Sequence, residues 1–264
     1  MDENEVYHND TSRIGKSGLD LIAQAPAKYY AKYLDPNRER EKKTPALITG
    51  SAMHTLILEP YKFSSEFAVM PEFSGEGMKK RKEAWEQNNV GKQPISMETY
   101  NQVSRMRDAA MSHPLVPELL SVGVVEQRMD WEDPATGALC KGKPDFRNTS
   151  SGLIIDLKST EDASENGFTK SAYSFRYHVQ APFYTDGARL NGFNPTGFVF
   201  VAIEKEPPYL VNVYFADEQF MAHGRMVYQQ DLETYMECVM TGKWPGYSPE
   251  IKPLSLPTWV ANKL

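Results

Sequence analysis

Two aspartates and a lysine stand out in the segment "KGKPDFRNTSSGLIIDLKST", residues 141–160. Asp156 lies within an apolar run, and Lys158 follows it two positions later. Successive side chains of a β-strand alternate between faces, so these two would point to the same side of a sheet. A carboxylate in a buried strand is costly unless a nearby charge compensates it. The compensating charge is either the Lys158 ammonium or a divalent metal ion.

Two more acidic residues precede Asp156 on predicted neighbouring strands. Asp145 follows "KGKP", and Glu126 lies in "VVEQRMDW". If adjacent strands present one acid each, the three carboxylates can converge on one site. Mg²⁺ prefers oxygen ligands and usually keeps water and substrate phosphate among them. The set suits phosphodiester hydrolysis by a metal-activated water, which Lys158 would orient or assist. A structural ion pair between Asp156 and Lys158 is the alternative.

Composition and charge restrict the class of protein. The chain has 264 residues, enough for one large α/β domain or two small ones. Its net charge of −6 argues against a surface coated with nucleic acid, but allows a basic groove on an acidic body. Cys140 and Cys238 form no CxxC pair, which argues against a zinc ribbon or an iron–sulfur cluster. With no signal-like or membrane-spanning apolar segment, we expect a cytoplasmic protein with no membrane partner.

The acids and the lysine fall in a region of predicted strands that follows a mainly helical region. The predicted helices are 16–34, 45–59, 78–89, 97–112, about 166–190 and 217–241, and the predicted strands are 122–133, 137–146, 152–160, 196–204 and 209–216. Ser17, Thr44 and Ser96 are the predicted N-caps. The order indicates an α/β fold with a mixed central sheet flanked by helices. We expect one domain with a mainly helical part (1–120), a compact core (121–241) and a C-terminal tail (242–264).

Two short motifs resemble those of a known superfamily. "KPDF" and "IIDLK" resemble the PD-(D/E)xK nuclease core, with Asp145, Asp156 and Lys158 in the motif positions. "HVQAPFY" resembles the QxxxY motif of the RecB-like branch, which lies on the helix after the DxK strand. Gln180 and Tyr184 are four residues apart and would share one face of that helix. The resemblance implies a restriction-endonuclease-like fold.

A wider resemblance covers nearly the whole chain. The segment "GSAMHTLILEP" resembles the histidine helix of the same branch and places His54 at the matching position. With "IGKSGLDLIAQAPAKYY", "WEDPATGALCKGKPD" and "LSLPTW", it makes the chain similar to the nuclease domain of the exonuclease VIII, or RecE-type, family. RecE proteins can carry a long region before the nuclease. The chain is therefore similar to the nuclease module alone, as a fragment or as a short, phage-like version.

The resemblance implies a Mg²⁺-dependent exonuclease, with Mn²⁺ able to substitute. Such an enzyme degrades linear double-stranded DNA from 5′ to 3′ and leaves a 3′ single-stranded tail for a single-strand annealing protein. It also implies a ring-shaped homo-oligomer, a tetramer or trimer, that threads DNA. An endonuclease on the same core and a non-cleaving DNA-binding module are the alternatives. The core motif does not separate exonuclease from endonuclease, whereas the intact acids and lysine argue against the non-cleaving module.

The resemblance also assigns a role to each residue of the catalytic core. Asp145 and Asp156 would be the main metal ligands, with His54 as an additional ligand. Lys158 would be the catalytic lysine. Glu126 would contact metal or water directly or through another group. The alternatives are ion pairing for the two aspartates and Lys158, a core position for His54, and a solvated strand position for Glu126.

Further residues are candidates for contact with DNA. Gln180 and Tyr184 would bind a DNA phosphate or orient the active site, or else simply pack the helix. Two basic runs, one within 38–43 and one at 79–82, could contact the DNA backbone, although such runs are usually solvated. The second run consists of Lys79, Lys80, Arg81 and Lys82. His178 lies close to Gln180 in sequence and could reach the same site.

Overall fold

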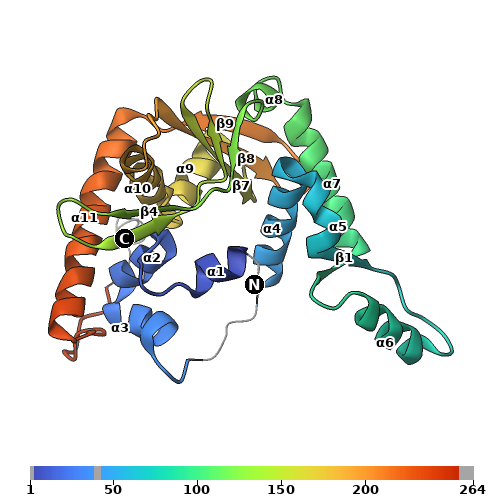
Figure 1. The fold of residues 1–264 in the computed structure, drawn as a ribbon, viewed down its shortest axis with the longest axis horizontal. Helices are drawn as coiled ribbons and strands as arrows, with labels where there is room; N and C mark the ends of the chain where they lie inside the picture. The colour runs from blue at the N-terminus through green and yellow to red at the C-terminus, as the bar shows by residue number, and fades with distance from the viewer. Residues whose placement is uncertain (1–2, 39–42, 256–264) are drawn as a thin grey trace.

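A five-stranded sheet forms the centre of the computed structural model, which describes residues 3–38 and 43–255 (Figure 1). In spatial order its strands are β3 (Gly123–Val125), β6 (Phe146–Asn148), β7 (Leu153–Thr160), β8 (Gly197–Glu204) and β9 (Val211–Phe215). β7 and β8 are parallel, and the other neighbouring pairs are antiparallel. The predicted fold class, α/β with a mixed central sheet flanked by helices, is confirmed.

Helices surround this sheet, and two small sheets extend it. The helices are α1 (Glu3–Asn9), α2 (Lys16–Gln24), α3 (Pro26–Tyr29), α4 (Pro45–Leu58), α5 (Phe63–Glu66), α6 (Met78–Asn88), α7 (Met97–Ser112), α8 (Val116–Leu119), α9 (Glu165–Ser174), α10 (Tyr177–Leu190) and α11 (Glu218–Thr241), with a π-helical turn at Tyr30–Leu34 and a 3₁₀ turn at Pro60–Lys62. β1 (Phe67–Met70) pairs in parallel with β2 (Gln93–Ser96), and β4 (Met129–Glu132) pairs antiparallel with β5 (Leu139–Gly142). No helix within the described ranges is both long and apolar enough to cross a membrane.

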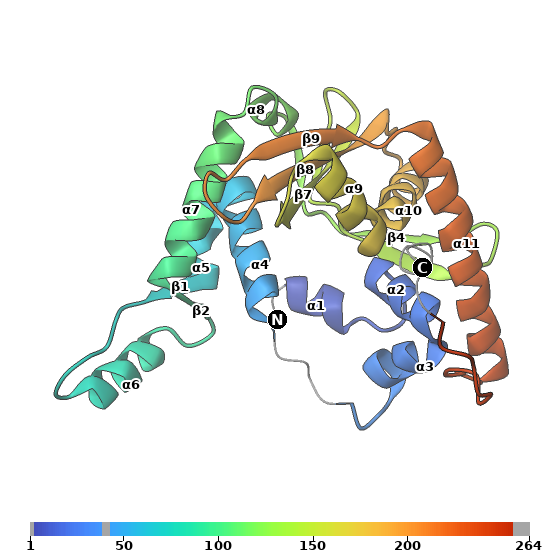
Figure 2. The ribbon, with the colours of Figure 1, turned by 180° about the vertical axis from the view of Figure 1, so that it is seen from behind.

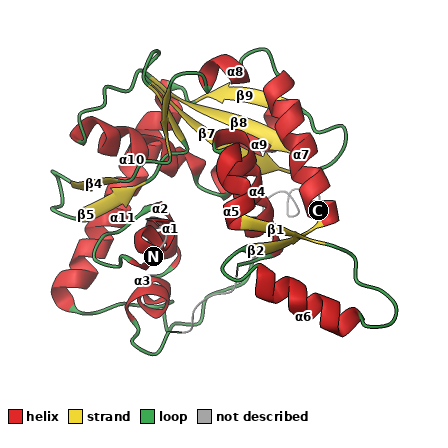
Figure 3. Ribbon diagram, turned by 45° about the vertical axis from the view of Figure 1, so that its right-hand side comes forward, coloured by secondary structure: helices red, strands yellow, loops and turns green. Residues whose placement is uncertain are grey.

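Side-chain alternation along β7 separates two hydrophobic cores. Ile154 belongs to a core that α2, α10 and α11 share with the β4–β5 hairpin. Ile155 and Leu157 belong to a second core, formed with α4 and α7. Figure 3 shows α4 and α10 on opposite sides of the strands. Asp156 and Lys158 lie two and four positions after Ile154 and share its face of the strand. Their side chains therefore point toward α10 rather than α4.

Two of the three predicted N-cap residues, Thr44 and Ser96, do cap helices. Thr44 accepts a hydrogen bond from the Leu47 amide, and Ser96 accepts one from the Thr99 amide. The prediction for Ser17 is wrong, because α2 starts after Gly15 without a side-chain cap. Ser17 lies in the first turn, where its hydroxyl is 3.2 Å from that of Tyr33.

Tight turns divide three predicted elements. Glu126, directly after β3, has a left-handed φ of 43°, so the predicted strand 122–133 breaks and β4 leaves the central sheet. The predicted strand 137–146 also breaks, between β5 and β6, but residues 143–145 include no left-handed residue. Arg176 has a φ of 56° and divides the predicted helix 166–190 into α9 and α10. Sequence periodicity does not report such left-handed residues outside glycine.

Close contact between α10 and α11 depends on a glycine. A Cβ placed on Gly224 would lie 1.5 Å from the carbonyl oxygen of His178. We expect Gly224→Ala to lower the free energy of unfolding by about 1–3 kcal/mol, measured by urea denaturation, because the helices must separate. Gly50→Ala in α4 is the matched control, since the nearest atom to its Cβ is 4.0 Å away. Equal stability of both variants would contradict this account.

Candidate active site

Asp145 and Asp156 are brought together by the pairing of β6 with β7. Phe146 pairs with Ile155, so Asp145, directly before β6, lies beside the middle of β7. Its Oδ2 accepts a hydrogen bond from the Leu157 amide at 2.7 Å. The Asp145 side chain is 13% exposed, and Asp156 is 1% exposed. Two of the three predicted carboxylates thus lie close together and are largely shielded from solvent.

His54 reaches this pair from α4, on the other side of the sheet. Its Nε2 lies 3.0 Å from the Leu157 carbonyl oxygen, and its Nδ1 lies 3.5 Å from Oδ1 of Asp145. Burial disfavours the charged imidazole, but the Asp145 carboxylate outweighs it and raises the pKa of His54. His54 therefore links α4 to the Asp145 carboxylate and to the Leu157 carbonyl oxygen.

Lys158 and Gln180 hold the Asp156 carboxylate. Lys158 forms an ion pair with Oδ2 of Asp156, and Gln180 Nε2 donates to Oδ1 at 2.7 Å. Among the described residues, Oδ2 has no partner besides the Lys158 ammonium. Burial raises the pKa of Asp156 to about 6, the Lys158 ammonium opposes this rise, and the charge of Asp145 adds to it. The Asp156 carboxylate is thus costly in its charged form, as the sequence predicts.

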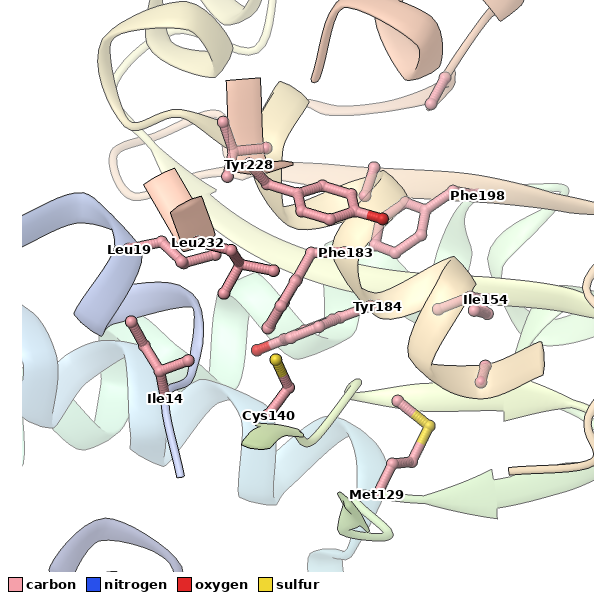
Figure 4. Packing of buried hydrophobic residues seen from close by; sticks show 14 of the residues in the cluster. Ile14, Leu19, Met129, Cys140, Ile154, Phe183, Tyr184, Phe198, Tyr228 and Leu232 are labelled. Atoms are coloured by element: carbon pink, nitrogen blue, oxygen red, sulfur yellow. The ribbon is translucent and has the colours of Figure 1, made fainter. Parts of the chain in front are cut away.

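Tyr184 lies one helical turn beyond Gln180 and is 9% exposed. Figure 4 shows its ring in the first core, with Phe183 and Cys140 nearby. Burial raises its pKa strongly, and a hydrogen bond with Gln180 opposes the rise. Tyr184 therefore stays a neutral phenol. Its position favours support of Gln180 and helix packing over direct contact with DNA.

Glu126 lies beside the cluster but is engaged by other groups. Its amide donates to the Asp145 carbonyl oxygen at 3.0 Å, and its carboxylate forms an ion pair with Lys143. The first bond couples the left-handed turn after β3 to the position of Asp145. A direct role of Glu126 at a metal or water stays a prediction.

His178 and the basic run 79–82, two further candidates for DNA contact, lie apart from this cluster. His178 is buried and stacks on Tyr173 and His223, with ring centroids 5.4 Å away in each case. The idea that it reaches the site of Gln180 gains no support, because positions two apart on a helix face different directions. The run 79–82 lies on α6, at the end of a projecting arm (Figure 2). Of the basic run 38–43, residues 39–42 lie outside the described residues.

Two residues without a recognisable sequence signal complete the site. Lys158 Nζ lies 4.7 Å from the ring centroid of Tyr177, the first residue of α10. Lys16 Nζ lies 5.9 Å from the same centroid. Burial lowers the pKa of Lys16, an effect that Asp20 opposes. The chain thus places a second ammonium group near the predicted catalytic lysine.

Comparison with known families identifies the domain. Residues 15–256 match the PDDEXK-like domain of unknown function DUF3799. The chain belongs to this family. The PDDEXK-like description agrees with the resemblance to the PD-(D/E)xK superfamily, whose nucleases generally use divalent metals.

Two solved structures described as exonucleases are among those that match the chain. A protein of Eubacterium rectale, described as a candidate exonuclease, has a TM-score of 0.68 and 16% identity, covering 97% of this chain and 96% of that chain. A phage-related exonuclease of Haemophilus somnus 129PT has a TM-score of 0.38 and 12% identity, covering 88% of this chain and 96% of that chain. No curated protein sequence matches the chain. At 16% identity, the first likeness establishes the fold alone.

The donor atoms of the PDDEXK-like site fit a divalent cation. Asp145 and Asp156 offer carboxylate oxygens, of which Oδ2 of Asp156 contacts only the Lys158 ammonium within the described part of the chain, and His54 in its neutral form offers a ring nitrogen. No three His, Cys, Asp or Glu side chains within 3–38 and 43–255 are already gathered as a metal site. In the structure, Lys158 pairs with Asp156, and His54 contacts Asp145. A bound metal ion would have to replace these contacts.

Proposed function

We propose that this protein is a Mg²⁺-dependent exodeoxyribonuclease that acts on the ends of linear double-stranded DNA. The observation that carries the nuclease part is the convergence of Asp145 and Asp156 on adjacent strands, with Lys158 against Asp156. Oδ2 of Asp156 is buried and, of the residues that the structure describes, contacts the Lys158 ammonium alone, which supports a positively charged ligand there. Exonuclease rather than endonuclease action rests on the RecE-type sequence resemblance.

Each residue of the cluster has a distinct task in this proposal. Asp145 and Asp156 hold Mg²⁺, which would activate water and neutralise charge on the phosphate, and His54 is an additional ligand. Burial lowers the pKa of Lys158, but Asp156 and Asp145 outweigh burial and raise it. Lys158 therefore stays an ammonium group that can stabilise the scissile phosphate and orient the water. Gln180 fixes the Asp156 carboxylate for metal binding.

The wider proposal follows the RecE-type resemblance. The enzyme digests from 5′ to 3′, leaves a 3′ tail for a single-strand annealing protein, and works as a ring-shaped homo-oligomer. Mn²⁺ can replace Mg²⁺. We place the protein in the cytoplasm, where its buried and unpaired cysteines, Cys140 and Cys238, would remain reduced.

Linear and covalently closed circular duplexes, incubated side by side, test the proposed function. With Mg²⁺ or Mn²⁺, we expect linear DNA to be degraded and closed circles to persist, because a ring admits only a free end. Excess chelator should stop the reaction, and Ca²⁺, with its larger and looser coordination shell, should support binding but little cleavage. Gel electrophoresis of both substrates, with strands labelled at either end, gives the measurement.

The outcomes of that experiment separate the alternatives. Release of 5′-terminal nucleotides first, leaving the 3′-ended strand single, supports the proposal. Rapid cutting of closed circles would favour an endonuclease, and binding without cleavage would favour a non-cleaving module. Release from the 3′ end would retain the chemistry and reject the RecE-type direction. Full activity in excess chelator would reject the metal mechanism.

The basic run on α6 can be tested through the salt dependence of DNA binding. We expect replacement of Lys79, Lys80 and Lys82 by glutamine to reduce the slope of log K against log salt by about 0.9 for each lost phosphate contact. Arg81 stays in place, because it donates to the carbonyl oxygens of Glu76 and Ser74 and supports the arm. The slope is measured by fluorescence anisotropy. An unchanged slope would show that the run is solvated and makes no contact with DNA.

A further inference from the structure

An exposed aromatic residue, Phe175, stands beside the candidate active site at the junction of α9 and α10. Its side chain is 61% exposed. The ring stacks on Tyr177 with a centroid separation of 5.9 Å and an interplanar angle of 25°. Tyr177 in turn lies under the Lys158 ammonium, at 4.7 Å from ring centroid to Nζ. One aromatic ring therefore separates Phe175 from the proposed catalytic lysine.

The backbone that carries Phe175 is firmly anchored. Lys16, with its side chain only 14% exposed, donates to the Phe175 carbonyl oxygen at 2.6 Å. The next residue, Arg176, adopts the left-handed conformation, donates to the Leu19 carbonyl oxygen at 3.0 Å and pairs with Asp231. A left-handed arginine and two nearly buried cations are costly features. Their combined effect is to fix an exposed ring in one place.

The cations near this ring suit an anionic ligand that also has a flat apolar part, and each is paired with one carboxylate, Lys16 with Asp20 at 2.8 Å and Lys158 with Asp156. Lys16 and Lys158 both lie near the ring of Tyr177, on which Phe175 stacks. A nucleotide combines a phosphate with a planar base, and a base on an aromatic ring is bound without regard to its identity. A base inside a duplex is stacked on both sides, so only an unpaired base or the open face of a terminal base pair can lie on Phe175.

We propose that Phe175 is a stacking platform for an unpaired nucleobase of the strand whose phosphodiester lies at the Asp145–Asp156 site. This subsite rests on the proposed function, which it deepens: the protein would engage the end of the cut strand as separated nucleotides rather than as intact duplex. Because stacking is tolerant of sequence, the platform suits digestion without base preference.

A double-mutant cycle between protein and DNA tests the platform. Binding of duplexes with an abasic residue at each terminal position of the 5′-ended strand is measured by anisotropy, with Ca²⁺ replacing Mg²⁺. We expect wild-type protein to lose roughly ten-fold in affinity at one position, as for loss of a base–aromatic stack. Phe175→Ala should bind intact DNA with a similar loss of affinity relative to wild type. An abasic residue at the sensitive position should then cause the variant no further loss. Phe175→Trp should retain the wild-type pattern. Asp156→Asn with Mg²⁺ provides the same measurement without cleavage.

Controls separate this subsite from packing and from the nuclease itself. Tyr247→Ala removes another ring of similar exposure, at 75%, which contacts Lys28 of α3, and should leave the abasic pattern intact. Equal loss by Phe175→Ala on intact and abasic DNA would assign Phe175 to packing around Tyr177 and overturn the platform. So would an absence of any abasic effect in wild type. Failure of wild type to cleave linear duplex with Mg²⁺ would instead reject the nuclease, since the binding cycle involves no cleavage.

Discussion

Lys158→Ala and Asp156→Asn are each expected to lower kcat for DNA cleavage by about a hundred- to ten-thousand-fold while DNA remains bound. The expected size follows from removing one group that orients water, binds metal or stabilises phosphate charge. Asp156→Asn should bind DNA as tightly as wild type or more tightly, because it removes a negative charge close to phosphate. Single-turnover cleavage and equilibrium binding on the same labelled duplex separate the two effects.

A purely structural ion pair between Asp156 and Lys158 makes a different prediction. It would leave kcat at the wild-type level in both variants. Stability gives a second readout, because the raised pKa of Asp156 shows that its charge is costly in the folded state. We expect Asp156→Asn to raise Tm, as sites that sacrifice stability for function do. Lys62→Ala, which breaks the surface pair with Glu59, is the control and should change neither kcat nor Tm appreciably.

Arg176→Met is expected to lower the free energy of unfolding by about 3 kcal/mol near pH 7. Methionine keeps the apolar stem but leaves the Asp231 carboxylate, 10% exposed, without its cation. It also removes the bonds to α2, through the Leu19 carbonyl oxygen and Asp20. Urea denaturation gives the measurement. Arg107→Met removes a surface pair with Asp108 and should cost no more than about 0.5 kcal/mol.

The loss in Arg176→Met should depend on pH with a defined sign. Burial raises the pKa of Asp231 from an ordinary 3.8 to about 6, although Arg176 opposes that rise. Between about pH 4 and 6 the folded protein therefore binds a proton that the unfolded chain has released, so this group favours folding more as pH falls. Without Arg176 the pKa rises further, and the variant should approach wild-type stability near pH 5. Arg176→Met with Asp231→Asn should recover stability near pH 7; no recovery would show that Asp231 is not the source.

Much of the fold and part of the candidate site follow from short-range patterns. The apolar run around Asp156 predicts β7, and strand alternation places Lys158 on the same face, because both depend only on neighbouring residues. The caps Thr44 and Ser96 are equally local. The spacing of Gln180 and Tyr184 correctly places them on one helix, α10. These predictions hold because backbone geometry alone sets the relation between the residues.

Tertiary structure decides the features that join distant parts of the chain. From the residues alone, nothing places His54 beside Asp145, because α4 reaches the site from the opposite core. The left-handed residues Glu126 and Arg176 break predicted elements, since long-range bonds hold conformations that local propensity disfavours. Lys16 near Lys158 is likewise a contact across the fold. The sequence by itself therefore determined the strand, its Asp–Lys pair and the helix of the glutamine. Only packing of α2, α4 and α10 around β7 decided which other groups share the site, because those contacts depend on the relative placement of whole elements.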